Sequence, residues 1–210
     1  MNAGCTVTRA GFELRSACSS CDGHPACGHL MLSRRQPLYL EGDPARHVFA
    51  VVAGYVRETR TTADGRIQGV RLVTPGGVAG YEALRSPLYR TSADALTRAR
   101  VCRVPRSEVE LQLRTHGDQA VAMIGALVDE LSFVRDSVLW IGALTAEERI
   151  LALLARLAGP DREARFRLPI TRLEMAELLG LSHSTVSRTL HRLAKAGALT
   201  LEGRMVRLAA

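Results

Sequence analysis

Apolar residues between positions 171 and 196 recur at helical intervals and predict two short helices joined by a tight turn. Thr171 with Glu174 three residues later forms a capping box, so the first helix is expected to begin there. Gly180 is expected to end it, and Ser182 to cap the second helix. The first helix is expected to carry Leu173, Ala176 and Leu179 on one face, and the second helix a buried stripe of Val186, Leu190 and Leu193.

The opposite face of the second predicted helix is polar and lacks acidic residues. Its side chains are short hydroxyls or groups that donate hydrogen bonds, which suits a helix that reads base edges in the major groove of DNA. The candidate DNA-binding residues are His183, Ser184, Ser187, Arg188 and His191. The competing interpretation is an ordinary helical hairpin with a solvated polar face.

The residues that follow predict a small wing. Apolar runs at 199–201 and 205–208 flank Glu202-Gly203, which is typical of a β-hairpin, and a helix-turn-helix followed by a hairpin is a winged helix. Between 160 and 210, nine Lys and Arg oppose five Asp and Glu, so this segment carries +4 of the chain's net charge of +7. A basic segment of this kind favours a phosphate backbone as its partner.

From position 38 to 104 the pattern changes to short apolar or alternating runs separated by turns that contain Gly and Pro. Such runs at near-regular spacing predict the strands of a small antiparallel barrel, the first of which begins at Leu38. The expected strands are 38–40, 48–52, 55–61, 67–73, 92–96 and 99–104.

Residues 119–141 predict a long helix, in which apolar residues alternate at intervals of three and four, the spacing of a coiled-coil seam. The seam consists of Ile124, Leu127, Leu131, Val134, Val138 and Ile141. A partner helix is needed to bury it, so we expect a homodimer in which two winged helices read two half-sites. The alternative is a helix that packs this seam on its own barrel. A further helix is expected from the Thr145 cap to Ala158.

Composition narrows the class of protein. With 210 residues, 47% hydrophobic, a mean hydropathy of +0.03 and a pI of about 9.7, the chain is expected to be globular and to bind nucleic acid or another anionic surface. It lacks an apolar run of membrane-spanning length and an apolar signal core, so a cytoplasmic protein without membrane association is expected. The scattered histidines, the lack of an evident catalytic triad or carboxylate pair, and the lack of a phosphate-binding glycine loop argue against an enzyme.

Three of the five cysteines lie within ten residues, in the sequence CSSCDGHPAC at 18–27. Turn residues between them allow Cys18, Cys21 and Cys27 to converge, and close thiolates in a reducing compartment favour ligation of zinc or an iron–sulfur cluster. The spacing does not decide between the two. The candidates for a fourth ligand are Cys5, His24, His29 and Cys102. A set of unligated surface thiols is the remaining interpretation.

The order of barrel, long helix and winged helix resembles the catabolite activator/FNR family of bacterial transcription regulators. The resemblance covers roughly residues 16–208. It rests on Cys18-Ser-Ser-Cys21-x5-Cys27, on Cys102 in Ala99-Arg-Val-Cys-Arg-Val-Pro, on Thr145-Ala-Glu-Glu-Arg149 and on Leu179-Gly-Leu-Ser-x-Ser-Thr-Val-Ser-Arg188. The cysteine spacing is similar to that of the FNR-type iron–sulfur branch.

The resemblance implies a [4Fe–4S] cluster that oxygen or nitric oxide destroys, with Cys18, Cys21, Cys27 and Cys102 as its ligands. Structural zinc or a thiol redox switch in the same architecture is the alternative. It also implies a transcription regulator that binds an inverted-repeat promoter as a homodimer and works with RNA polymerase, either as an activator or as a repressor.

Two departures from the family pattern matter for binding. Tyr81, in Gly80-Tyr81-Glu82, stands where the cyclic-nucleotide binders of the family carry a Glu, so no cyclic nucleotide is expected as a cofactor. Ser184 stands where the recognition helix commonly carries a Glu, whereas Ser187 and Arg188 are retained.

The expected fold class is therefore α+β, with an N-terminal antiparallel β-barrel that resembles cyclic-nucleotide-binding domains, a long dimerisation helix and a C-terminal winged helix-turn-helix. The expected boundaries are a Cys-rich segment at 1–30, the sensor barrel at 31–118, the dimerisation helix at 119–141 and the DNA-binding domain at 142–210.

Overall fold

A computed structural model describes residues 28–65, 67–158 and 165–209, apart from the side chains at 129, 133 and 136–142. The chain divides into two compact units, Met1–Ser132 and Phe133–Ala210. In the part of the chain that the structure describes, no helix has both the length and the apolar character needed to cross a membrane.

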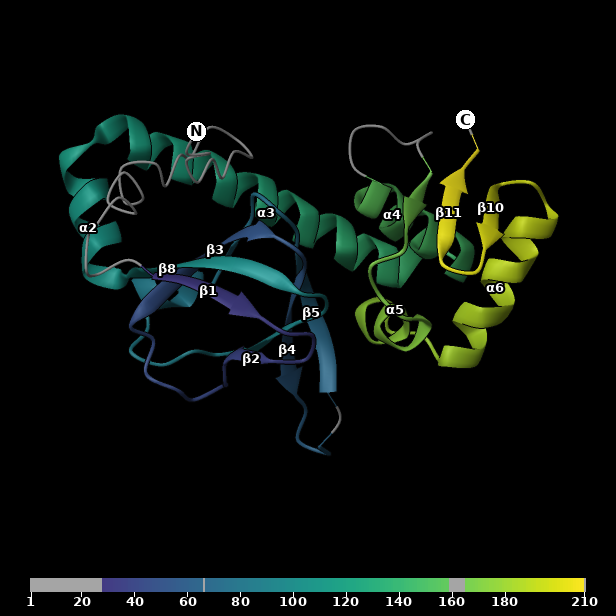
Figure 1. Cartoon of the computed structure of the whole chain (residues 1–210), viewed down its shortest axis with the longest axis horizontal. Coiled ribbons are helices and arrows are strands. Elements are labelled where there is room, and N and C mark those ends of the chain that lie inside the picture. Colours follow the sequence, from purple (N-terminus) through teal and green to yellow (C-terminus); the bar gives the residue numbers. More distant parts are fainter. Residues whose placement is uncertain (1–27, 66, 159–164, 210) are drawn as a thin grey trace. The chain divides into compact units, whose positions relative to one another are not determined.

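The first unit contains two four-stranded antiparallel sheets (Figure 1). The strands of one sheet are β1 (Gly28–Leu32), β3 (His47–Ala53), β6 (Val78–Ala79) and β8 (Ala99–Pro105), in the spatial order β1-β8-β3-β6. Those of the other are β2 (Pro37–Tyr39), β4 (Val56–Thr61), β5 (Ile67–Val73) and β7 (Ser92–Ala95), in the order β2-β7-β4-β5.

Buried residues from both sheets form one hydrophobic core, because alternate side chains of each strand point to the same face. Its members include Phe49, Val51, Val56, Val73, Ala95 and Val101. The turn between β3 and β4 requires glycine: Gly54 has a φ of 80°, and a Cβ there would lie 2.4 Å from the carbonyl oxygen of Arg98.

Helical segments complete this unit: a 3₁₀ turn, η2 (Tyr81–Leu84), and the helices α2 (Arg106–Thr115) and α3 (Gly117–Ala143). Val109 of α2 and Met123 of α3 are buried in the core of the sheets. The N-terminal half of α3 is therefore anchored to the β-domain through one of its faces.

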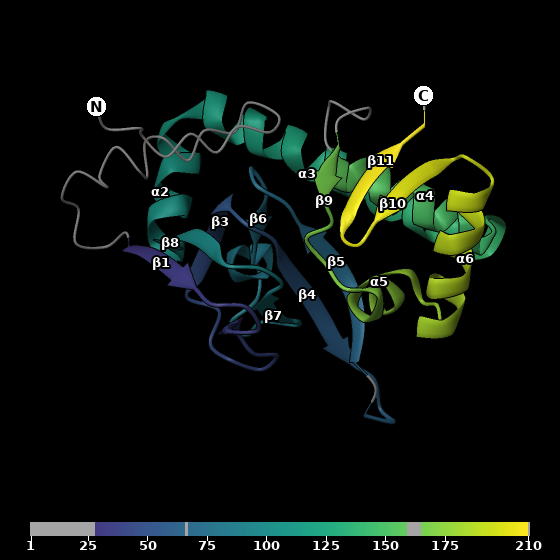
Figure 2. The ribbon, with the colours of Figure 1, turned by 45° about the vertical axis from the view of Figure 1, so that its right-hand side comes forward.

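The second unit is a small helical domain with a β-hairpin (Figure 2). Its helices are α4 (Ala146–Ala158), α5 (Arg172–Leu179) and α6 (His183–Lys195). Its strands are β9 (Phe166–Arg167), β10 (Leu199–Glu202) and β11 (Met205–Leu208), in the order β10-β11-β9. The largest fully buried side chains here are Ile150, Leu154, Ile170, Met175, Leu190 and Leu199.

The predicted helices at 119–141, 145–158 and 171–196, the six predicted strands and the C-terminal hairpin are confirmed to within a few residues. Three features differ. The first strand begins at Gly28, directly after Cys27, and not at Leu38. Its pairing with β8 is a contact between residues far apart in the sequence, which local turn signals do not reveal. The helix α2 and the two-residue strands β6 and β9 were not predicted.

Leu173 was expected on the same helix face as Ala176 and Leu179, but 51% of its surface is exposed whereas the other two are buried. Successive steps of three residues drift around a helix that has 3.6 residues per turn. The buried face of α5 instead contains Met175, Ala176 and Leu179. Met175 and Ala176 lie four and three residues before Leu179, the spacings at which residues share one face of a helix.

Candidate nucleic-acid interface and sensor site

The start of α5 and the turn between α5 and α6 are defined by capped helix ends. Thr171 Oγ1 accepts a hydrogen bond from the Glu174 amide at 3.2 Å, and Glu174 Oε2 accepts one from the Thr171 amide at 2.7 Å. Gly180, with a φ of 64°, ends α5, and Ser182 Oγ accepts from the Thr185 amide at 3.1 Å. The predicted capping box and both caps are confirmed, and they satisfy backbone groups that a short helix leaves unpaired at its ends.

The helix α6 separates an apolar face from a polar one. Val186, Leu190 and Leu193 are buried as predicted. His183, Ser184, Arg188 and His191 are exposed and Ser187 is half-buried, so the five candidate DNA-binding residues lie together on the accessible side of one helix. No acidic residue occurs between His183 and Lys195. This helix face therefore has no negative charge that would repel the phosphates lining a DNA groove.

Local hydrogen bonds orient part of this polar face. Arg172 Nη1, on α5, donates to Ser187 Oγ at 2.7 Å, and His191 Nδ1 lies 2.8 Å from the Ser187 carbonyl oxygen. Ser184 Oγ lies 2.9 Å from Ser182 Oγ. Among the residues that the structure describes, Arg188 has no hydrogen bond or ion pair, so its guanidinium can be directed entirely at an external acceptor.

Two arginines whose contacts were not predicted from the sequence connect separate segments of the second unit. Arg149 Nε donates to the Leu144 carbonyl at 3.1 Å and its Nη1 to the Leu179 carbonyl at 3.5 Å, which joins the start of α4 to the end of α5. Arg204 donates twice to the Leu168 carbonyl, at 3.2 and 2.8 Å. Carbonyl acceptors carry no side-chain signature, so only the place of Arg149 in the Thr145–Arg149 motif pointed to it.

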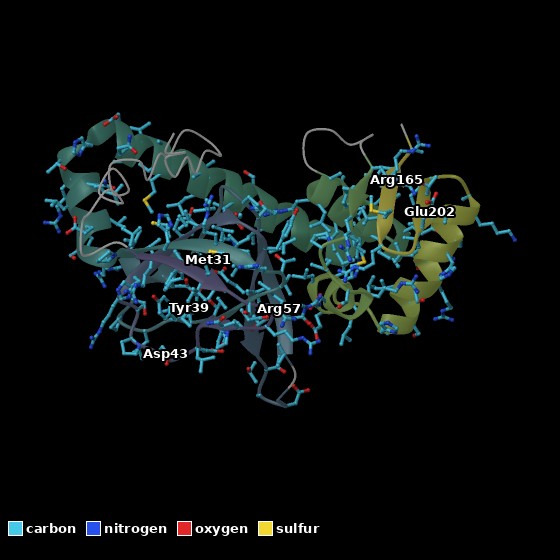
Figure 3. All side chains as sticks on the ribbon, viewed as in Figure 1. Met31, Tyr39, Asp43, Arg57, Arg165 and Glu202 are labelled. Carbon is cyan, nitrogen blue, oxygen red and sulfur yellow. The ribbon has the colours of Figure 1, made fainter. Side chains whose placement is uncertain are left out.

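The wing is a two-stranded hairpin with a short turn. Glu202 of β10 pairs with Met205 of β11, and Gly203 in the turn has a φ of 61°. Arg165 and Glu202, both labelled in Figure 3, form an ion pair. A second ion pair joins Arg192 of α6 to Glu147 of α4. Both pairs are solvent-exposed, so they orient the surface charges more than they stabilise the fold.

Cys102 is the only candidate cluster ligand among the cysteines within the described residues, because Cys5, Cys18, Cys21 and Cys27 lie outside them. It is 1% exposed and occupies β8, between β1 and β3. Its Cα partners are His29 and Ala50, and directly opposed residues carry their side chains on the same face of a sheet. Cys102 and the exposed His29 are therefore neighbours on one sheet face.

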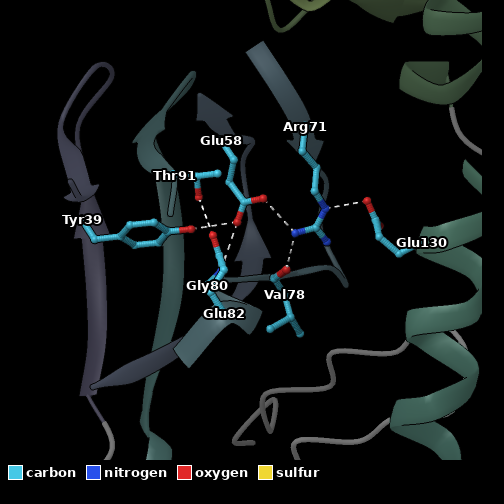
Figure 4. A network of polar contacts seen from close by, with 8 residues as sticks. All are labelled: Tyr39, Glu58, Arg71, Val78, Gly80, Glu82, Thr91 and Glu130. Atoms are coloured by element: carbon cyan, nitrogen blue, oxygen red, sulfur yellow. Dashed lines mark hydrogen bonds and ion pairs between the residues drawn. The ribbon is translucent and has the colours of Figure 1, made fainter. Parts of the chain in front are cut away.

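A cluster of polar groups lies buried in the β-domain (Figure 4). Glu58 of β4 is 5% exposed, and its Oε1 accepts from Tyr39 Oη at 2.8 Å and from the Gly80 amide at 3.1 Å. Its Oε2 lies 3.1 Å from Arg71 Nη1. The pKa of Tyr39 is raised far above its usual range, mainly by burial and further by the negative charges of Glu58 and Glu82. The phenol therefore keeps its proton and donates a hydrogen bond to Glu58.

Arg71 of β5 connects this cluster to the long helix. Its Nη1 also donates to the Val78 carbonyl at 2.9 Å, and its Nε donates to Glu130 of α3 at 2.5 Å. Its guanidinium carbon lies 5.4 Å from the centre of the Tyr81 ring. Burial opposes the charge of Arg71, but Glu58 and Glu130 outweigh it, so the pKa of the guanidinium is raised.

The segment 80–84 resembles the phosphate cassette of the family's cyclic-nucleotide binders, and it forms the turn η2 at Tyr81–Leu84. Gly80 precedes it with a φ of 75°, and its amide is already bonded to Glu58. Tyr81 is half-buried against Arg71, and burial raises the pKa of its phenol. Glu82 accepts a hydrogen bond from Thr91 Oγ1 at 2.8 Å. The Gly80 amide and the Glu82 carboxylate are thus already bonded to residues outside the turn.

The predicted seam runs along α3 next to its anchored face, because Leu127 and Val134 lie four and eleven residues after the buried Met123. Within a single chain, Ile124, Leu127, Leu131 and Val134 are between 39% and 60% exposed. The side chains of Val138 and Ile141 lie outside the described residues. Four large apolar side chains in a row on one helix face form a stripe that water solvates poorly. We refer to these four residues as the α3 stripe.

A winged helix with an acid-free polar recognition face, carried on one chain with an antiparallel β-domain and a long helix, defines a DNA-binding transcription regulator and not an enzyme. Residues 148–209 match the Crp-like helix-turn-helix domain and residues 30–116 match the cyclic nucleotide-binding domain. The transcriptional activator protein FnrL of Cereibacter sphaeroides is 30% identical over 205 residues, which cover 90% of this chain and 82% of FnrL. The chain belongs to the CRP/FNR family of transcription regulators.

Other relatives agree on the whole architecture. The nitrogen fixation regulation protein FixK of Azorhizobium caulinodans is 32% identical over 177 residues, covering 81% of this chain and 71% of FixK. The solved structure of FixK2 from Bradyrhizobium japonicum superposes with a TM-score of 0.79 at 31% identity, covering 88% of this chain and 93% of FixK2. The predicted α+β fold class is thereby confirmed.

Proposed function

We propose that this regulator senses oxygen, nitric oxide or redox state through a [4Fe–4S] cluster held by Cys18, Cys21, Cys27 and Cys102. The register of β1 on β8 carries the proposal. Gly28, which is bonded to Cys27, is the Cα partner of Arg103, which is bonded to Cys102. Antiparallel partners lie about 4.5–5.5 Å apart and consecutive Cα atoms about 3.8 Å apart. Chain connectivity alone therefore limits the distance between the Cα atoms of Cys27 and Cys102 to at most about 13 Å.

The donor set fits such a group. Four cysteine thiolates are the usual ligands of a [4Fe–4S] cluster. The backbone of Cys102 is held in a strand that is paired on both sides, and its side chain is buried from water. When bound, the cluster supplies a centre that oxygen or nitric oxide destroys. The protein's part is to present three thiols from one short segment to a fourth on the sheet.

The alternative keeps the regulator and replaces the cluster by structural zinc or a thiol redox switch. A specific observation favours zinc over unligated thiols: His29 shares the sheet face of Cys102, and imidazole nitrogen with thiolate sulfur is a common zinc ligand set. Among the described residues, no group of three or more potential ligands converges, so either metal requires the cysteines at 18–27.

For DNA recognition we propose that α6 enters the major groove and that His183, Ser184, Ser187, Arg188 and His191 face the bases. The α3 stripe supports a homodimer, because pairing two copies buries apolar side chains that a single chain exposes. Two paired winged helices would read an inverted repeat. As its relative FnrL is named a transcriptional activator, we propose activation together with RNA polymerase for this chain as well.

The polar cluster of the β-domain supports a regulator that is independent of cyclic nucleotides. Glu58 already occupies the Gly80 amide of the cassette, and Arg71 is neutralised by Glu58 and Glu130. A cyclic nucleotide would have to displace these bonds without the acidic residue that Tyr81 replaces. We also retain the domain boundaries at 31, 119 and 142 as a proposal.

DNA binding under controlled oxygen tests the sensing proposal. Wild-type protein purified without oxygen should bind a short inverted-repeat duplex, and exposure to air should weaken that binding. Alanine variants of Cys18, Cys21, Cys27 and Cys102 should each remove the response to air, whereas Cys5→Ala, the matched control, should keep it. A response to air that survives in all four variants would contradict the cluster.

A further inference from the structure

The arginine that follows the α5 cap makes one directed contact with the recognition helix. Arg172 Nη1 donates to Ser187 Oγ at 2.7 Å, a distance typical of a hydrogen bond assisted by charge. Arg172 is the first residue of α5, where the positive end of the helix dipole disfavours a cation. Its presence there is therefore not explained by the stability of α5.

This contact determines which hydrogen bonds Ser187 has left to make. A guanidinium only donates, whereas a serine hydroxyl has one proton and two lone pairs. Arg172 uses one lone pair, and its positive charge polarises the hydroxyl so that its proton is donated more readily. Thr115 and Ser132 turn their hydroxyl protons back to carbonyls of their own helices. Among the described residues, Ser187 has no such acceptor for its own.

We propose that Arg172 is a specificity-positioning residue, which fixes Ser187 as a hydrogen-bond donor toward the DNA base that it faces. In the major groove guanine offers O6 and N7, adenine N7 and thymine O4 as acceptors, while cytosine offers only an amino donor. A Ser187 whose proton is directed at the DNA therefore favours a base with an acceptor at that position of each half-site. Its second lone pair can still accept from the cytosine amino group, so cytosine is disfavoured and not excluded. The inference rests on the proposed role of α6 as the reading helix.

A different role for the same residue has a distinguishable signature. If Arg172 contacted a DNA phosphate and nothing more, its removal would weaken binding to all sequences equally. It would also lower the slope of log affinity against log salt by about one unit. A residue that acts through Ser187 changes the preference at one base pair and leaves that slope unchanged.

The experiment is selection of binding sites from duplexes with randomised half-sites, with wild type, Arg172→Ala, Ser187→Ala and the double variant. Wild type should disfavour cytosine at one position of each half-site. Arg172→Ala and Ser187→Ala should each relax that position by about fivefold, the size of one net hydrogen bond, and the double variant should relax it no further. Arg192→Ala, an exposed arginine of α6 paired with Glu147, is the matched control and should leave the position unchanged.

Circular dichroism and the salt slope accompany each variant, and Arg172→Met, which also removes the guanidinium, replaces Arg172→Ala if the alanine variant does not fold. Uniform weakening in Arg172→Ala with a reduced salt slope would overturn the proposal, as would relaxation of different positions by the two single variants. Failure of the reading-helix role itself looks different, because the wild type would then enrich no sequence.

Discussion

Arg188 is the residue of α6 whose loss should change base preference most. Its side chain is exposed and uncommitted within the described part of the chain, and arginine forms bidentate bonds with guanine O6 and N7. Arg188→Ala should cost about 1–3 kcal/mol of binding free energy and relax the preference at one guanine. Fluorescence anisotropy with a set of singly substituted duplexes measures both effects. Lys195→Ala, also exposed on α6, is the control, and equal weakening on every duplex by Arg188→Ala would refute the base contact.

Arg71 should contribute far more to stability than an exposed arginine on the same β-domain. Its removal in Arg71→Met would leave Glu58 buried without its cation, which typically costs about 3–5 kcal/mol of unfolding free energy. Arg60→Met is the matched control, since Arg60 lies 3.8 Å from Glu41 on the surface, and such pairs contribute about 1 kcal/mol or less. Denaturant unfolding compares the two variants, and equal losses would show that the Glu58 cluster is not held by Arg71.

The same cluster predicts how the β-domain responds to nucleotides. Because Glu58 binds the Gly80 amide and Tyr81 replaces an acidic residue, millimolar cyclic AMP should leave DNA affinity unchanged. Titration calorimetry and DNA binding with and without the nucleotide provide the measurement. A saturable heat of binding accompanied by a change in DNA affinity would contradict this expectation.

At the scale of elements, the sequence predicted what local chemistry determines. The capping box at Thr171, the Gly180 end of α5 and the Ser182 cap follow from adjacent residues, and each forms as expected. The strand β1 was not predicted because its partner strand β8 lies about 70 residues later in the sequence, as the pairs Gly28 with Arg103 and Leu32 with Ala99 show. For the same reason the Glu58–Arg71–Glu130 contacts were not foreseen, since they join β4, β5 and α3.

The candidate site was predictable to the same extent. Periodicity placed the five polar residues on one face of α6, and the structure brings them together there. The support of that face by Arg172 was invisible, because a contact between the start of α5 and the middle of α6 depends on how the helices cross. Cys102 was assigned as a ligand by resemblance alone. The register of β1 on β8 adds that Gly28, the first described residue after Cys27, pairs with Arg103, the residue after Cys102.

The α3 stripe leads to a prediction about association. An aspartate at the seam position Leu131 would place two charges in the apolar contact of a symmetric dimer. Leu131→Asp should therefore raise the dimer dissociation constant at least about tenfold, given the ~25 cal/mol gained per Å² of apolar surface buried. Val121→Asp is the control, since Val121 is 70% exposed on α3 but lies off the seam. Sedimentation velocity at micromolar concentration distinguishes them, and an unchanged Leu131→Asp dimer would place the interface elsewhere.

At the scale of the whole molecule, no charged residue occupies the predicted seam, so association should not depend on the state of the sensor. We expect a dimer with and without the cluster, and a signal that shifts the placement of the two winged helices by a change of population. Sedimentation of the anaerobic and air-exposed forms checks this. A clean change from dimer to monomer on air exposure would show that the sensor controls association instead.

The central claim is that the cysteines at 18, 21, 27 and 102 hold an iron–sulfur cluster in a CRP/FNR regulator. Purification without oxygen, followed by a visible spectrum and analysis of iron, sulfide and zinc, tests it most directly. The account predicts a brown protein with about four irons and four sulfides per chain that bleaches in air. A colourless protein with stoichiometric zinc would contradict it.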